Sequence, residues 1–355
     1  MTAAKNQKVR FGLYYDFRNP SRWRQPSDRL YREILDQIVW GENSGFDDVW
    51  VSEHHFIDDG YLPSTLPVAA AIAARTKKIR IALGVLLMPF HNPVRLAEDV
   101  AVVDVISGGR FELGVGAGYK DEEFKGFAVP HKERGARTNE ALGIVRRLLG
   151  GETVTFKGKF FEVNNVKVTP EPIQKPHPPI WIGGFTPAAL RRGARYGDGF
   201  ITPRADRSVY NSYVAELQNQ GRPTNNIKFA GGHQWLIVSN DPEKTWNEAA
   251  DHIIYQNDNY MAWSEKEFAA WSEKTGQTIN LPYLRDREGL RRSNQLLVLE
   301  PEKAIKLIRD YISAVPITHY YSWTLPPGLP PSWIQPYLEL FASKVIPAFN
   351  GQGTP

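Results

Sequence analysis

The chain of 355 residues contains no cysteine, and this absence excludes several kinds of chemistry. Disulfide cross-links, thiolate nucleophiles and cysteine metal ligands are all ruled out. Any metal site would have to use histidine and carboxylate ligands. Candidate functional residues must therefore be found among the histidines, the acids and the glycine-rich strand ends.

The sequence also lacks long apolar runs and a large charge of one sign. No segment approaches membrane-spanning length, and the N-terminus has no apolar core as long as that of a signal peptide. The formal net charge is only +4, and Lys and Arg are spread along the chain rather than gathered into a basic run. We therefore expect a cytoplasmic protein that binds neither a membrane nor nucleic acid.

The composition is that of an ordinary globular protein, with 42% hydrophobic and 23% charged residues. Division by typical domain length would suggest two domains, but α/β barrels of this size are often one. We therefore treat residues 1–355 as a single domain.

Short apolar runs alternate with helical patterns along most of the chain, which is typical of a parallel sheet. Eight runs are expected to be strands, at about residues 9–15, 47–53, 79–88, 110–116, 179–184, 198–203, 226–239 and 317–323. Eight strands predict closure into a (β/α)8 TIM barrel. A doubly wound open sheet is the alternative, because periodicity does not show whether a parallel sheet closes.

Two segments interrupt this alternation. Residues 153–170 alternate aromatic and polar side chains around a Lys-Gly pair, which predicts a small antiparallel excursion. Residues 260–294 are rich in Trp, Glu, Lys and Arg and contain Gly276 and Pro282. We expect them to form an irregular insertion, which in a barrel can serve as an active-site lid.

The stretch VWVSEHHF places Glu53, His54 and His55 directly after the second predicted strand. Neighbouring side chains on a strand point to opposite faces, so the two histidines cannot easily bind one metal ion. They can be satisfied polar groups at a strand end. They also fall on the face where barrels carry their active sites, where an imidazole can transfer protons near neutral pH.

Two glycine-rich strand ends are candidate ligand sites. In RFELGVGAGYKDEEF the spacing is wrong for a dinucleotide fingerprint, but glycines such as Gly116 can let a flat ligand approach the backbone or serve a tight turn. In WIGGFTPAALRRGARYG, Gly183 and Gly184 precede Thr186 as a helix N-cap. Such a helix start can bind a phosphate, or can be an ordinary capped helix.

These stretches, taken in order, resemble the bacterial luciferase-like family of flavin-dependent oxidoreductases. The matching pieces are GFDDVWVSEHHF, the long stretch from RTKKIRIALGVLLMPFHNPVRLAEDV to SGGRFELGVGAGYKDEEFKGFAV, PIWIGGFTPAALRRGARYGDGFI, and residues 317–349. The resemblance covers roughly residues 9–350, apart from 260–294.

The resemblance implies a barrel that binds reduced FMN, supplied by a separate flavin reductase, and uses dioxygen to oxygenate a small organic substrate. A sister branch uses the deazaflavin coenzyme F420 and transfers hydride instead, and the family also has non-catalytic flavin-binding members. All three functions remain open, with the FMN monooxygenase as our leading hypothesis. Because the family commonly dimerises, we expect a homodimer.

The resemblance also implies roles for particular residues. The first histidine of the EHH motif is the catalytic one in this family, and here it is His54. The family often has a non-prolyl cis peptide beneath the flavin, which corresponds to Gly84–Val85. The flavin phosphate would be bound by the Gly183, Gly184 and Thr186 loop together with Arg137. Where luciferases carry a further phosphate arginine, this chain has Ala117.

The substrate itself is not indicated by the sequence. Tyr14, Trp23 and Trp323 are expected to wall a substrate pocket, with Glu53 and His55 supporting it. An anionic substrate is one option, since arginines occur in predicted loops, namely Arg22, Arg24, Arg204, Arg291 and Arg292.

Overall fold

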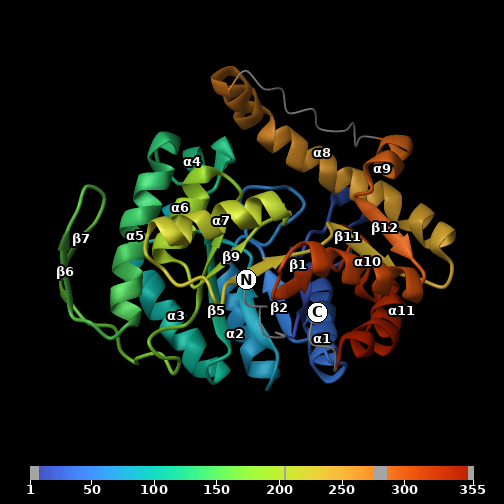
Figure 1. Ribbon diagram of the computed structural model, residues 1–355, viewed down its shortest axis with the longest axis horizontal. Helices are drawn as coiled ribbons and strands as arrows, with labels where there is room; N and C mark the ends of the chain where they lie inside the picture. The colour runs from blue at the N-terminus through green and yellow to red at the C-terminus, as the bar shows by residue number, and fades with distance from the viewer. Residues whose placement is uncertain (1–7, 204, 276–285, 351–355) are drawn as a thin grey trace.

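The computed structural model describes residues 8–203, 205–275 and 286–350, and its centre is a closed parallel barrel (Figure 1). Hydrogen-bonded neighbours follow the order β3-β2-β1-β13-β10-β9-β8-β5, and pairing of β5 with β3 closes the ring. The barrel strands are β1 (Arg10–Tyr15), β2 (Asp48–Val51), β3 (Arg80–Leu83), β5 (Phe111–Gly116), β8 (Ile180–Gly183), β9 (Gly199–Ile201), β10 (Lys228–Gly231) and β13 (His319–Tyr321). The predicted (β/α)8 barrel is confirmed, and the open sheet is excluded.

Helices surround this barrel, as in other parallel barrels. They are α1 (Ser27–Asn43), α2 (Thr65–Arg75), α3 (Pro93–Ser107), α4 (Asp121–Gly126), α5 (Arg134–Leu149), α6 (Pro187–Tyr196), α7 (Arg207–Asn219), α8 (Pro242–Thr275), α9 (Arg287–Ser293), α10 (Pro301–Ala314) and α11 (Pro331–Leu340). Short 3-10 turns occur at η1 (Ser21–Trp23), η2 (Met88–Phe90), η3 (His131–Glu133) and η5 (Ile346–Phe349), and a π-helical turn at η4 (Phe341–Val345). Among the described helices, none combines the length and the apolar character that crossing a bilayer requires.

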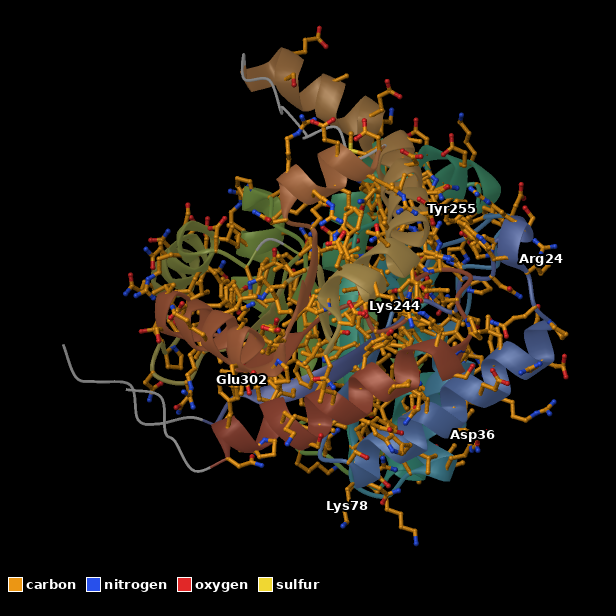
Figure 2. All side chains as sticks on the ribbon, turned by 90° about the vertical axis from the view of Figure 1, so that its right-hand side faces the viewer. Arg24, Asp36, Lys78, Lys244, Tyr255 and Glu302 are labelled. Atoms are coloured by element: carbon orange, nitrogen blue, oxygen red, sulfur yellow. The ribbon has the colours of Figure 1, made fainter. Side chains whose placement is uncertain are left out.

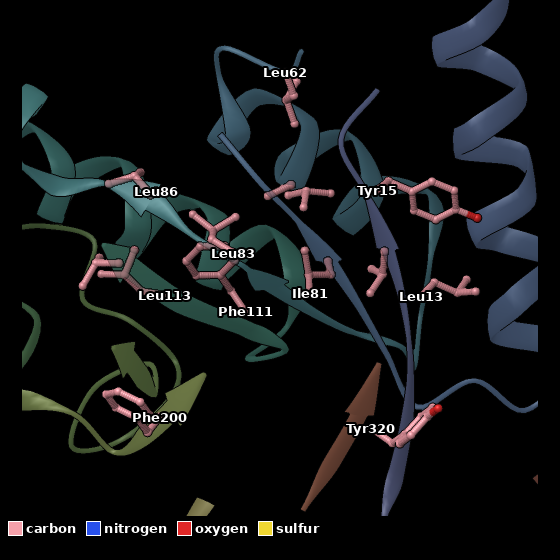
Figure 3. Packing of buried hydrophobic residues seen from close by; sticks show 14 of the residues in the cluster. Leu13, Tyr15, Leu62, Ile81, Leu83, Leu86, Phe111, Leu113, Phe200 and Tyr320 are labelled. Carbon is pink, nitrogen blue, oxygen red and sulfur yellow. The ribbon is translucent and has the colours of Figure 1, made fainter. Parts of the chain in front are cut away.

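Alternation along the strands produces two apolar layers, because successive side chains point to opposite faces. Leu13 and Tyr15 of β1 point outward to α1, as Figure 3 shows, and the Tyr15 hydroxyl lies 2.8 Å from Gln37 Oε1 on that helix. Tyr14 of β1 and Trp50 of β2 point inward and pack with Trp181 inside the barrel. The interior is therefore filled with large aromatic side chains.

Helix α3 starts and ends at capping residues. In α3, the side chain of Asn92 accepts hydrogen bonds from two backbone amides, Pro93 stands at the first helical position, and Gly108 ends the helix in a left-handed conformation. Each of these residue types is the one favoured at its position. These residues explain why α3 begins at Pro93 and ends at Ser107.

Two predicted strands differ from the structure. The run at 79–88 is divided into β3 and a short β4 (Leu86–Leu87) by the cis peptide Gly84–Val85. The run at 226–239 is also divided: β10 stays in the barrel, whereas β11 (Trp235–Val238) leaves it and pairs with β12 (Leu296–Leu299). A Cβ on Gly232 would lie 2.0 Å from the carbonyl oxygen of Tyr321, so the chain passes there too closely for any other residue.

The antiparallel excursion is confirmed as β6 (Val154–Lys157) paired with β7 (Glu162–Val166). The prediction that residues 260–294 are irregular is wrong for the described residues, which are mostly helical. Residues 260–275 are the second half of the 34-residue helix α8, and most of 286–294 forms α9. In Figure 1, α8 runs obliquely across the top of the molecule, on the side away from α1, α2 and α3. Residues 276–285 lie outside the described part.

Candidate active site at the carboxyl ends of the strands

The two adjacent histidines bind different carboxylates. Nδ1 of His54 lies 2.8 Å from Oε1 of Glu123, and the same oxygen accepts a 2.8 Å hydrogen bond from the backbone amide of His55. The His55 side chain instead places Nε2 3.0 Å from Oε1 of Glu53. The pair therefore serves two separate hydrogen-bond networks, and no group of three metal-ligating side chains occurs among the residues that the structure describes.

Glu123 fixes the orientation of the His54 ring. A carboxylate accepts hydrogen bonds only, so its contact with Nδ1 places the hydrogen on that nitrogen and leaves Nε2 available for proton exchange. The Tyr119 hydroxyl lies 3.5 Å from Nε2. Both His54 and Glu123 are buried. The arrangement has the geometry of an oriented general acid or base.

Glu53 belongs to the supporting network. Burial by itself would raise the pKa of Glu53, but the hydrogen bond with His55 and the nearby imidazole of His91, 3.6 Å away, outweigh it and lower the pKa to about 2. Its oxygens also accept from the hydroxyl of Thr65 and from the amide of Leu87, which follows the cis peptide. Glu53 thus ties the end of β2 to β4 and to the start of α2, and it remains ionised near neutral pH.

Aromatic rings surround the free side of His54. The ring of Tyr61 lies 4.9 Å from that of His54 between centroids, Trp263 lies at 5.1 Å and Tyr260 at 6.0 Å. Tyr260 and Trp263 come from α8, and the Tyr260 hydroxyl is 2.9 Å from that of Tyr61. The second half of α8 therefore covers the proposed proton-transfer residue.

The structure brings the predicted strand-end glycines together around Val85. A Cβ at Gly116 would lie 2.7 Å from one methyl group of Val85, and a Cβ at Gly183 would lie 2.6 Å from the other. The hydroxyl of Tyr14 donates to the carbonyl of Gly84. The ends of β1, β3, β5 and β8 meet at this point, next to the network of Glu53.

The predicted helix start is present, but Arg137 has different neighbours. Thr186 caps α6, with its side chain accepting a hydrogen bond from the amide of Ala189, and Gly184 has φ of +142°. Arg137 donates from Nε to the carbonyl of Pro89 at 3.1 Å, and its guanidinium lies over Phe161. No hydrogen bond among the described residues joins Arg137 to the Gly183–Thr186 loop.

Of the other predicted pocket residues, Trp323 lies near the site and Trp23 lies further out. The Trp323 ring is 4.4 Å from Tyr14 and 6.3 Å from Tyr260. The Trp23 ring packs on His252 at 4.0 Å and lies 5.9 Å from Tyr255 between centroids.

The sequence-based search missed Glu123, Tyr61, Tyr260 and Trp263, and also the buried Arg18. One signal was available for Glu123, which follows the glycine-rich strand end in the acidic run DEEF. The α8 residues had another signal, since no Gly or Pro occurs between Pro242 and Gly276, as a long helix requires.

Comparison with known proteins shows the family of the chain. The family model for luciferase-like monooxygenases matches residues 9–316. The oxygenase component of a flavin-dependent trigonelline monooxygenase from Acinetobacter baylyi is 24% identical over 96% of each chain. An F420-dependent glucose-6-phosphate dehydrogenase from Microbacterium testaceum is 38% identical, over 53% of this chain and 58% of its own.

Two further comparisons bear on coverage and fold. An uncharacterized Sinorhizobium fredii protein, y4vJ, is 34% identical, and the chain spans only 53% of its length. The monooxygenase RslO1 from Streptomyces bottropensis has the same fold, with a TM-score of 0.80, 24% identity and coverage of 96% of this chain and 100% of its own. Since the family model spans most of the chain, this protein belongs to the luciferase-like monooxygenase family.

Proposed function

We propose that this chain is the oxygenase component of a two-component flavin monooxygenase. It would take reduced FMN from a separate flavin reductase and use dioxygen to oxygenate a small organic substrate. The observation that carries the proposal is His54, oriented by buried Glu123 at the carboxyl ends of the strands and shielded by rings from α8. The trigonelline monooxygenase component, which is flavin-dependent and similar over nearly both full lengths, supports a flavin monooxygenase over a deazaflavin-dependent enzyme.

The residues present fit a bound flavin. Gly116 and Gly183 leave room for Val85 between the strand ends, and Val85, which is partly buried, offers a small apolar support for a flat ring. The capped start of α6 presents backbone amides beside Gly184, where a phosphate can bind. Arg137 would contribute to the phosphate site by moving away from Pro89. Reduced flavin, when bound, supplies the electrons that activate dioxygen.

His54 would transfer the proton that the oxygenation requires. Glu123 keeps Nδ1 protonated and stabilises the imidazolium, so Nε2 can receive or release a proton at one defined position. Tyr14, Tyr61 and Trp323 would line the substrate pocket, with Trp23 at its outer end. Tyr260 and Trp263 of α8 would exclude water from the reacting centre, so residues 260–275 would act as the lid.

A deazaflavin-dependent oxidoreductase is the second candidate, because the F420-dependent dehydrogenase matches 53% of this chain at 38% identity. The two candidates differ in the coenzyme bound and in whether dioxygen is consumed. A non-catalytic flavin-binding barrel is the third, and the retained His54–Glu123 pair argues against it.

A homodimer is proposed from one exposed apolar surface. Val102, Val105 and Ile106 form a stripe on α3 at helical spacing, and each is at least 39% exposed. Ile173 lies beside the end of this helix, 3.2 Å from a Cβ placed on Gly109, and is 52% exposed. We call these four residues the α3 patch. A second copy of the chain is its proposed partner.

The test of the proposed function is an anaerobic titration with reduced FMN and, separately, with reduced F420, followed by admission of dioxygen. We expect one reduced FMN to bind per chain and to return to its oxidised spectrum more slowly than free reduced FMN. Binding of F420 alone, without dioxygen consumption, would establish the second candidate. Binding of FMN without product from any substrate would favour the third.

A further inference from the structure

Arg18, directly after β1, is a buried cation that the proposed chemistry does not use. Its side chain is 0% exposed and pairs with Asp59, which is almost as deeply buried. Nε donates to Oδ2 of Asp59 at 2.6 Å. Nη2 lies 2.6 Å from the same oxygen but without the alignment of a hydrogen bond, and Nη1 has no hydrogen-bond partner in the described part of the chain.

The unused edge of this guanidinium has a defined chemical preference. Nη1 and Nη2 present two parallel N–H groups, the geometry that a carboxylate fills with two hydrogen bonds. Leaving such donors buried and unpaired costs free energy, so a native partner is expected. Asp59 occupies the other edge, which leaves this one for a ligand.

Arg18 and His54 share the same aromatic walls. The Arg18 guanidinium lies 5.5 Å from the ring centroid of Tyr61 and 5.5 Å from that of Trp263, the two rings that also flank His54. Tyr255 of α8, labelled in Figure 2, covers it at 5.2 Å. A ligand whose acidic group meets Arg18 would therefore place its apolar body beside Tyr61 and Trp263, within reach of His54.

Nearby charges are compatible with a bound anion. The ammonium of Lys120, a second buried cation, lies 6.0 Å from the Trp263 ring and donates to the His55 carbonyl at 3.3 Å. Burial raises the pKa of Asp16 to about 7, although Arg18 opposes this, so near neutral pH much of Asp16 is uncharged. The arginines expected from the sequence are less suitable. Arg22, Arg24, Arg291 and Arg292 are exposed, and Arg204 lies outside the described residues.

We propose that Arg18 is the specificity-determining residue for a substrate that carries a carboxylate on a flat apolar skeleton. This inference rests on the proposed function, because it names the substrate class of the same site. Arg18 would bind the carboxylate on its Nη1–Nη2 edge, and the α8 rings would close over the apolar part.

The test compares acids with their neutral amides by isothermal titration calorimetry. The probes are benzoate, 2-naphthoate and indole-3-acetate, each against the matching amide, with and without saturating FMN. We expect the wild-type protein to bind at least one acid about tenfold or more tightly than its amide, since charge-assisted paired hydrogen bonds are lost in the amide. Titration without FMN tests this inference separately from the proposed function. A failure of the proposed function would appear as absent FMN binding, and not as equal affinity for acid and amide.

Two Arg18 variants are compared, so that the test does not depend on the folding of either one alone. Arg18→Lys keeps the charge beside Asp59 but loses the paired edge, and Arg18→Met combined with Asp59→Asn removes both charges together. We expect both to retain the fold by thermal melting and to lose the preference for the acid. Arg24→Lys is the matched control, since Arg24 lies at the edge of the molecule in Figure 2, and it should keep the preference. Equal affinity for acid and amide in the wild type, no binding of any acid, or a preference retained in both variants would overturn the inference.

Discussion

At the scale of single residues, the most informative contact is the one between His54 and Glu123. It joins the end of β2 to α4 across 69 positions of sequence, so neither residue defines the site alone. Glu123 touches His54 rather than a substrate, which makes it a positioning residue. The two residues should therefore respond differently to substitution.

We expect His54→Ala to retain its affinity for reduced FMN and to lose turnover by about a hundredfold or more, since it removes the proton-transfer group. Glu123→Gln should lose less, about tenfold, because an amide can still face Nδ1 but no longer fixes the ring as an acceptor-only carboxylate does. Steady-state kinetics and flavin titration measure both.

His55→Gln is the matched control for these substitutions. It breaks the contact with Glu53, so we expect a lower melting temperature with turnover of the folded protein changed only a few-fold. Full activity in His54→Ala, or unchanged turnover in Glu123→Gln, would remove the proposed roles.

A second residue-scale prediction concerns Asp48, buried inside the barrel on β2. Burial first, and then the charge of Glu112, raise its pKa from 3.8 to about 7, against a hydrogen bond from Trp50. Because the pKa of Asp48 is higher in the folded state than in the unfolded state, its contribution to the free energy of folding becomes less favourable as pH rises. Each pH unit between the unfolded and folded pKa values costs about 1.4 kcal/mol, so the penalty is at most about 4 kcal/mol above pH 7.

Asp48→Asn should therefore match the wild type in free energy of unfolding near pH 4 and exceed it near pH 8. The amide oxygen can still accept from Trp50, so packing is kept. Urea unfolding at the two pH values measures the difference. If the difference in free energy of unfolding between the variant and the wild type is the same at pH 8 as at pH 4, the raised pKa of Asp48 is contradicted.

At the scale of elements, α8 decides how closed the site is. Its first half adds buried residues to the hydrophobic core, and its second half reaches His54 through Tyr260 and Trp263. A helix is a firmer cover than the irregular insertion expected from the sequence, because its side chains are held at fixed spacing. Its function as a lid can be tested through the fate of dioxygen.

We expect Trp263→Ala to admit water to the reacting centre, so that more of the consumed dioxygen appears as hydrogen peroxide and less as product. The peroxide-to-dioxygen ratio, measured with the substrate present, should rise severalfold. Trp333→Ala is the control, since that tryptophan is half-buried on α11 and bonds to Glu248. An equal ratio in Trp263→Ala and the wild type would show that α8 does not shield the site.

At the scale of the whole molecule, the α3 patch predicts the oligomeric state. We expect light scattering after gel filtration to give about twice the chain mass of 40.2 kDa, because apolar surface of this kind is usually covered. Ile106→Glu should shift the mass toward that of one chain. Glu302→Lys on α10 changes charge elsewhere and should not. A wild-type mass of one chain would exclude the dimer.

The sequence by itself determined the barrel, its alternation of strands and helices, and the position of His54 at a strand end. These features depend on local periodicity and capping, which neighbouring residues specify. The glycines around Val85 were also found, because strand ends that approach closely require residues without a side chain.

Only the tertiary structure decided which distant side chains meet. It divided the predicted seventh strand between two sheets, brought Glu123 to His54, and placed Trp263 of α8 beside both His54 and Arg18. It also distinguished Arg18 from the exposed loop arginines. Burial and partner choice depend on contacts between segments far apart in the chain, and a local pattern of residues carries no information about them.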